Sequence, residues 1–70
     1  MRITHLMADK RITATQIASD AGIHHSVISK LLHGKNQPTA TTVRKLCAAY
    51  PDLTPGGIMA DYFDASRVTD

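Results

Sequence analysis

The segment from residue 13 to residue 34, TATQIASDAGIHHSVISKLLHG, restricts the fold more than any other part of the chain. Thr13 is a good N-cap, and the glutamine three residues later completes a capping-box pattern. Gly22 ends the first apolar stripe, where a helix commonly closes on a residue with positive φ. A second helix is expected from about His24 to His33. The sequence therefore predicts two short helices joined by a tight turn.

The second of these helices has two chemically different sides. At about 100° per residue, one side is apolar and carries Val27, Ile28, Leu31 and Leu32. The opposite side is polar and carries His25, Ser26, Ser29, Lys30 and His33. None of these polar residues is acidic, and each can donate a hydrogen bond. This side suits an anionic partner, while an ordinary solvated helix face is the alternative that the pattern leaves open.

The charges of the chain are unevenly distributed. The net charge is only +2, but residues 1–50 hold seven basic side chains against two acidic ones. Residues 51–70 hold Arg67 against four aspartates. Negative charge is thus kept away in sequence from the polar side of the second helix, as binding to a phosphate backbone requires.

Length and composition limit the remaining possibilities. Seventy residues, 43% of them hydrophobic and only 4% aromatic, make one small domain with an aliphatic core. A core of this size supplies roughly 3–5 kcal/mol, so a dimer contact would add useful stability. One cysteine, no apolar run long enough for a membrane span and no signal-peptide pattern lead us to expect a cytoplasmic protein.

Three further helices complete the expected all-α, five-helix domain. Ile3, Leu6 and Met7 have helical spacing before the central segment. Thr39 can cap a helix that runs to about Tyr50, with Val43, Leu46, Cys47 and Tyr50 on its core side. Thr54-Pro55 starts a last helix, which two glycines weaken by about 1 kcal/mol each. We expect the domain to span residues 1–63 and residues 64–70 to form a flexible tail.

Neither metal binding nor catalysis is expected. The chain has no C-x-x-C or H-x-x-x-H spacing, and adjacent His24 and His25 would point apart on a helix. Cys47 falls on an apolar stripe and is interpreted as a small core residue. No combination of nucleophile, base and oxyanion donor can be assembled from the sequence. We therefore expect no enzymatic activity, no cofactor and no small-molecule ligand.

The expected elements are, in order, a short helix, two helices joined by a turn, a proline-containing loop and two further helices. This order resembles the Cro and lambda-repressor-like helix-turn-helix family. The resemblance covers about Ile3 to Phe63, and it is most specific at Ile12-Thr13, Ile17-Ala18, Gly22-Ile23, Ile28-Ser29, Leu31 and Gly34 through Pro38. The family commonly opens this motif with a Thr-Gln pair whose glutamine touches phosphate. Here that position is Ala14, so the contact is expected from Thr15 or Gln16. Leu32 also differs from the polar residue often found at its position.

The resemblance implies roles for individual residues. Those in positions that read base edges in the major groove are His25, Ser26 and Lys30. Those expected to contact phosphate are Thr15, Gln16, Ser29, Lys35, Asn36, Gln37, Thr39 and Arg44. For each residue, simple solvation at the surface is the alternative.

The last helix carries an apolar stripe with two competing explanations. Its members are Ile58, Met59, Tyr62 and Phe63. They either close the core over the neighbouring helices or form a two-fold dimer contact, as the terminal helix does in small members of the family.

Taken together, the sequence predicts a sequence-specific transcriptional regulator of prokaryotic or phage type, a repressor or Cro-like protein. It would bind a pseudo-palindromic operator in double-stranded DNA, as a homodimer at least on DNA, with no separate effector domain. The alternative is a protein-binding module, such as an antitoxin, in which the acidic residues 51–70 meet a protein partner and DNA binding is secondary.

Overall fold

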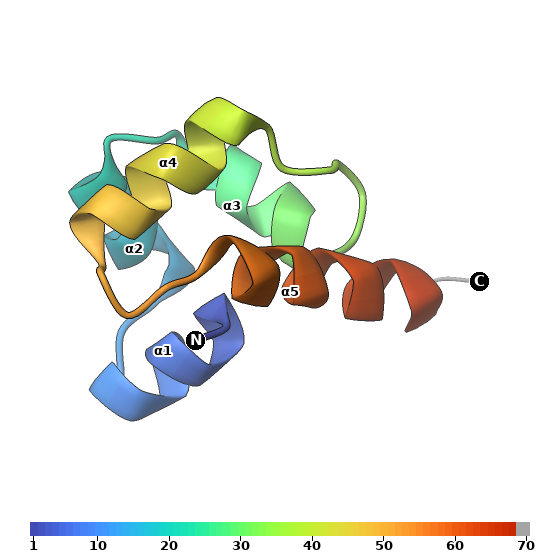
Figure 1. The fold of residues 1–70 in the computed structure, drawn as a ribbon, viewed down its shortest axis with the longest axis horizontal. Helices are drawn as coiled ribbons and strands as arrows, with labels where there is room; N and C mark the ends of the chain where they lie inside the picture. The colour runs from blue at the N-terminus through green and yellow to red at the C-terminus, as the bar shows by residue number, and fades with distance from the viewer. Residues whose placement is uncertain (69–70) are drawn as a thin grey trace.

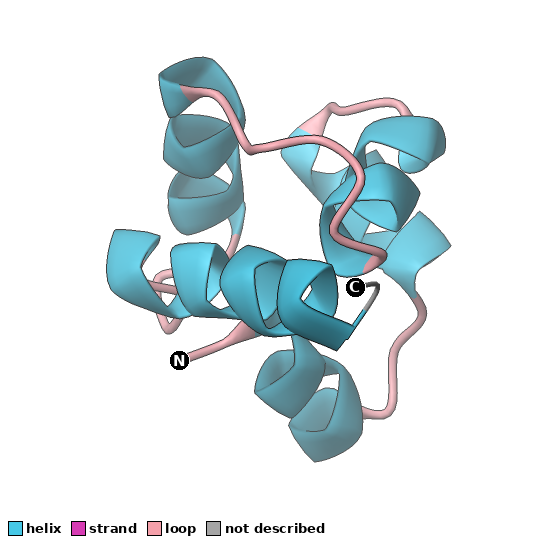
Figure 2. Ribbon diagram, turned by 90° about the vertical axis from the view of Figure 1, so that its right-hand side faces the viewer, coloured by secondary structure: helices cyan, strands magenta, loops and turns pink. Residues whose placement is uncertain are grey.

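The chain folds into five α-helices in the computed structural model, which describes residues 1–68. Their bounds are α1 Ile3–Lys10, α2 Ala14–Ala21, α3 His25–Leu32, α4 Ala40–Ala49 and α5 Pro55–Val68. Figure 1 shows α5 between α1 on one side and α3 and α4 on the other, while α2 packs against α3 and α4. No strand occurs among the described residues (Figure 2). The predicted all-α fold with five helices is confirmed.

The core is aliphatic, as the composition predicts. Every helix contributes at least one buried apolar side chain, and the connection between α4 and α5 contributes Leu53. The other members are Ile3, Leu6, Ile17, Ala18, Ile28, Leu31, Leu46 and Ile58. Full burial of one such Leu or Ile side chain is worth about 1.5–3 kcal/mol. Because each helix shares this one cluster, the packing fixes their relative positions.

Threonine caps begin three of the helices. The Oγ1 atoms of Thr13, Thr39 and Thr54 accept backbone N–H groups three residues later, at 3.0–3.2 Å. The capping box predicted at Thr13 forms only in part. The side chain of Gln16 donates to Asp20 Oδ1 at 2.9 Å instead of reaching back to the N-cap. The starts of α2, α4 and α5 are therefore fixed by local sequence.

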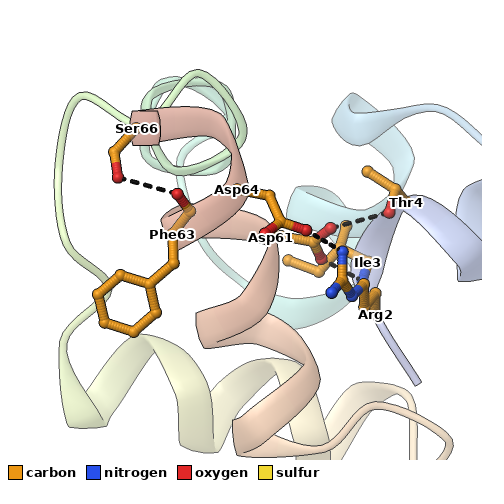
Figure 3. A network of polar contacts seen from close by, with 7 residues as sticks. All are labelled: Arg2, Ile3, Thr4, Asp61, Phe63, Asp64 and Ser66. Carbon is orange, nitrogen blue, oxygen red and sulfur yellow. Dashed lines mark hydrogen bonds and ion pairs between the residues drawn. The ribbon is translucent and has the colours of Figure 1, made fainter. Parts of the chain in front are cut away.

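The first helix is capped by a residue from the last one. The N-cap of α1, Arg2, makes no side-chain capping bond of its own. Asp61 of α5, 4% exposed, accepts the N–H of Ile3 at 2.6 Å and the hydroxyl of Thr4 at 2.8 Å. Figure 3 shows this carboxylate beside the ion pair between Arg2 and Asp64. A carboxylate at a helix N-terminus is favoured both by the exposed N–H groups and by the helix dipole.

Two glycines allow the ends of α5 to approach other backbone closely. A Cβ on Gly57 would lie 2.4 Å from the carbonyl oxygen of Met1. A Cβ on Gly34, which follows α3 with φ +70°, would lie 2.4 Å from the backbone nitrogen of Ser66. The two glycines of α5 were expected to weaken this helix, but Gly57 provides the space in which α5 meets the N-terminal segment.

The last helix is longer than expected. Residues 64–68, predicted as part of a flexible tail, continue α5 as far as Val68. Asp64 pairs with Arg2, and Ser66 donates its hydroxyl to the carbonyl of Phe63 at 3.1 Å. The remainder of the predicted tail, residues 69 and 70, lies outside the described residues.

A hydrogen bond between side chains ties α2 to the end of α4. Tyr50, the C-cap of α4, donates its phenolic hydroxyl to the carboxylate of Asp20 in α2. This bond, with smaller effects from desolvation and the Asp20 charge, raises the pKa of Tyr50 to about 12. The neutral phenol is thus the form that the folded protein prefers.

Asp61→Asn should destabilise the protein by about 1.5–3 kcal/mol, because a buried charged acceptor is lost from the start of α1. The matched control is Asp64→Asn, which removes the same charge from an exposed ion pair and should cost about 0–1 kcal/mol. Denaturant unfolding of both variants measures the difference. Equal losses of unfolding free energy in the two variants would show that the Asp61 cap stabilises the protein no more than the exposed ion pair does.

Tyr50→Phe should lower the unfolding free energy by about 1 kcal/mol near neutral pH, through the lost hydrogen bond to Asp20. Because the pKa of Tyr50 is higher in the folded state than in the unfolded state, the protonated phenol stabilises the fold. This stabilisation is complete below the unfolded-state pKa near 10 and disappears as pH rises through about 12. The gap between parent and variant should therefore close between pH 10 and pH 12. Tyr62→Phe is the control, and a gap independent of pH in unfolding curves would contradict the expectation.

Candidate nucleic-acid interface

The exposed side of α3 carries the polar residues that the sequence predicts. His25, Lys30 and His33 are exposed, while Ser26 and Ser29 are half-buried. Ile28 and Leu31 on the opposite side are fully in the core. The predicted division of this helix into a core side and a polar side is therefore present. We call the five polar residues the α3 polar face.

One apolar residue lies on the wrong side of that division. Val27 was expected in the core with its neighbours, but it is 37% exposed. It borders a surface hollow instead of packing beneath α3.

A hollow of about 260 Å³ separates α3 from the connection that follows it. Its walls come from α3, from residues 36–39 and from the first turn of α4, and comprise Ser26, Val27, Lys30, Leu31, Asn36, Gln37, Pro38, Thr39 and Thr42. Two predicted base-reading residues, Ser26 and Lys30, thus lie beside three predicted phosphate-contacting residues. The other predicted residues do not line the hollow: His25 and Ser29 lie on α3, Thr15 and Gln16 on α2, Lys35 in the connection and Arg44 on α4.

Internal hydrogen bonds already occupy several predicted DNA-contacting side chains. The Thr39 hydroxyl donates to Thr42 Oγ1 at 3.0 Å and accepts the N–H of Thr42 at 3.2 Å. Gln16 donates to Asp20 at 2.9 Å. Since phosphate oxygens only accept hydrogen bonds, a phosphate contact from the Thr39 hydroxyl would require it to give up its bond to Thr42.

Three cationic side chains, on α3, on the connection after it and on α4, are available to an anionic partner. Lys30, Lys35 and Arg44 are exposed, and within residues 1–68 the one ion pair joins Arg2 to Asp64. That pair and Asp61 lie at the start of α1 (Figure 3). Two of the four aspartates in residues 51–70 are therefore engaged inside the domain, remote in sequence from α3.

The apolar stripe of α5 divides between core and surface. Ile58 was among the predicted dimer contacts, but it is 0% exposed and belongs to the core of its own chain. Met59 and Tyr62 are half-buried, and Phe63 is 52% exposed. Figure 3 shows the Phe63 ring turned away from Asp61 and Asp64. The side chains that remain available for a contact between copies are those of Met59, Tyr62 and Phe63.

Two residues near α3 have roles that were not assigned from the sequence pattern. His24 is the N-cap of α3, and its side chain accepts the backbone N–H of Ser26. Histidine is not among the preferred N-cap residues, so its type gave no signal. Thr42 is buried beside the hollow and bonds to the N-cap residue Thr39. Its position three residues after Thr39 is the sequence signal that could have predicted this bond.

Other kinds of site find little support in the described part of the chain. Within residues 1–68, no three His, Cys or Asp side chains are grouped in a way that could hold a metal ion. None of the helices there is both long enough and apolar enough to cross a membrane.

Comparison with known proteins agrees with the geometry of α2 and α3. The family model of the Cro/C1-type HTH DNA-binding domain matches residues 2–64, which include α1 to α4 and most of α5. Searches among curated proteins and among solved structures give no significant match. Since the family model covers nearly the whole chain, this protein belongs to the Cro/C1-type helix-turn-helix DNA-binding family.

Proposed function

We propose that this protein is a sequence-specific transcriptional regulator that inserts α3 into the major groove of an operator. The observation that carries the proposal is the acid-free polar face of α3, bordered by the hollow that brings Ser26 and Lys30 beside residues 36–39. An α-helix fits the major groove, where each base pair presents a distinct pattern of donors and acceptors.

Within this proposal, His25, Ser26 and Lys30 read base edges. The ammonium group of Lys30 suits the O6 and N7 acceptors of guanine, and His25 can donate to guanine or to phosphate. His25 and Lys30 are exposed and Ser26 is half-buried on an eight-residue helix, which allows simultaneous contact with neighbouring base pairs.

The phosphate contacts surround this reading surface. The amide groups of Asn36 and Gln37 and the charges of Lys35 and Arg44 are exposed on the connection and on α4. Ser29, Thr15 and the backbone N–H groups at the start of α4 add further donors. Gln16 and Thr39 contribute only if their present side-chain bonds are exchanged for phosphate.

We further propose that two copies bind together, through the exposed part of the α5 stripe. Met59, Tyr62 and Phe63 supply the apolar surface, and the rings of Tyr62 and Phe63 already contact each other at 5.5 Å between centroids. A two-fold dimer would place two α3 helices about 34 Å apart, one turn of DNA. By occupying an operator, such a dimer would block polymerase, as a repressor or Cro-like protein does.

The test is selection of bound duplexes from a random library, followed by binding assays at low and physiological salt. We expect enrichment of a pseudo-palindrome with half-sites one helical turn apart, and two protein chains per duplex by sedimentation. Failure to retain any duplex at low salt would overturn the proposal and favour a protein partner. A single enriched half-site with one chain bound would overturn the dimer.

Lys30→Ala should weaken binding to the selected operator by about 1–3 kcal/mol and relax the preference at one base pair. Lys10→Ala removes the same charge from α1, on the far side of α5 in Figure 1, and should have little effect. Titrations against operator and scrambled duplexes measure both. An equal loss on every sequence would make Lys30 a phosphate contact.

Arg44→Ala should weaken binding to all duplexes alike, because a backbone contact carries no sequence information. The slope of log K against log salt should fall in magnitude by about one, since one fewer counterion is released. Binding measured from low to moderate salt, with Lys10→Ala as the reference, gives this slope. A slope equal to that of the parent would remove Arg44 from the phosphate contacts.

A further inference from the structure

Two contacts tie His24, just before α3, to Ser26 in its first turn. The backbone nitrogen of Ser26 lies 3.2 Å from His24 Nδ1, and the hydroxyl oxygen of Ser26 lies 2.8 Å from the same atom. The ring of His25 stacks on that of His24, with 4.6 Å between centroids and 28° between planes, so the expectation that these two side chains point apart is wrong, because His24 is the N-cap and lies outside the helical turn. The orientation of the His24 imidazole is therefore restrained from several directions.

These contacts favour one arrangement of the hydrogens. A backbone N–H can only donate, so the bond from Ser26 requires a lone pair on Nδ1 of His24, which corresponds to the tautomer with its proton on Nε2. The Ser26 hydroxyl faces the same lone pair, so it must also donate. Its one hydrogen is then used, and only the lone pairs of Ser26 Oγ remain for another partner.

Ser26 faces the place where the proposed function puts DNA. It is half-buried and forms part of the wall of the hollow, together with Lys30 one turn later on α3. A free serine hydroxyl can bond with any base, because it both donates and accepts. Ser26 differs, since its hydrogen points back toward His24.

We propose that His24 is a positioning residue that makes Ser26 a hydrogen-bond acceptor toward DNA. In the major groove the base donors are the N6 amino group of adenine and the N4 amino group of cytosine, whereas guanine and thymine present acceptors there. Ser26 therefore selects adenine or cytosine on the strand that it contacts. This inference rests on the proposed function, because it specifies what one reading residue recognises.

The expected selectivity is modest and measurable. To donate to guanine or thymine, Ser26 must break its bond to His24 Nδ1. The loss of one neutral hydrogen bond changes an equilibrium by about fivefold. On the strand that Ser26 contacts, we therefore expect about a fivefold preference for adenine or cytosine over the base that reversal of the pair would place there.

Selection of duplexes with four proteins tests the proposal. Ser26→Ala identifies the base pair, as the position whose preference disappears. His24→Ala frees the hydroxyl, so the reversed base pair should become acceptable there, while the other positions keep their preferences. His24→Asn is the matched control, because an asparagine oxygen at an N-cap can still accept hydrogen bonds and should restore the parental preference.

The possible results distinguish a failure of the inferred role of His24 from a failure of the proposed DNA-binding function. A preference at this base pair that is unchanged in His24→Ala, or one that His24→Asn does not restore, would overturn the role of His24 and leave the DNA-binding function intact. Enrichment of no duplex at all would overturn the proposed function itself.

A second measurement needs no variant that might unfold. Long-range ¹H–¹⁵N correlation spectra of the parent protein at about pH 7.5 report which ring nitrogen of His24 carries the proton. A proton on Nε2 alone is expected. A proton on Nδ1 would make the Ser26 hydroxyl the acceptor in this pair and would overturn the inference.

Discussion

The buried carboxylate of Asp61 holds the first helix to the last, and α1 depends on this connection because its own N-cap residue makes no side-chain capping bond. An eight-residue helix is unstable alone in water, so α1 needs both a partner surface and a cap. Asp61 supplies the cap through Ile3 and Thr4, and Ile58 one turn earlier supplies part of the surface. Once α1 is held against α5, the apolar sides of the helices enclose a single core. Gly57 makes this possible because its missing side chain leaves space for the N-terminal backbone.

The same dependence on neighbours explains how α3 is held. Neither α2 nor α3 is longer than eight residues, and each is buried on one side only. Asp20 connects α2 to Tyr50 at the end of α4. The helix before the turn, α2, is therefore held by a side-chain hydrogen bond in addition to its packing in the core. The polar face of α3 is consequently supported by the packing and hydrogen bonds of the neighbouring helices, although none of its own residues belongs to the core. Such a separation of supporting residues from exposed ones suits a surface that must match the fixed geometry of a DNA groove.

Much of the fold could be predicted because its signals are local. The caps at Thr13, Thr39 and Thr54 and the positive φ of Gly22 depend on residues within one turn. The role of Asp61 could not be predicted, since its partner Ile3 is 58 positions away and an isolated aspartate resembles surface charge. For the candidate site, periodicity located the α3 polar face but misplaced Val27, because exposure at the edge of a helix face depends on how the next connection packs. Likewise, the stripe on α5 was visible in sequence, but only the packing shows that Ile58 faces inward. The bonds of His24 and Gln16 depend on side-chain orientation, which spacing alone does not specify.

The contact at Gly34 has a mechanical consequence. The last turns of α5 rest on the backbone just after α3, with no side chain between them that could change rotamer to absorb a displacement. Phe63, the most exposed aromatic residue of α5, lies only three positions before Ser66 at this contact. If two copies associate through Phe63, the path from the interface to each α3 consists of one helix and one backbone contact. The protein would then hold its two α3 helices at a fixed separation. Any variation in the distance between half-sites would have to come from bending and twisting of the DNA.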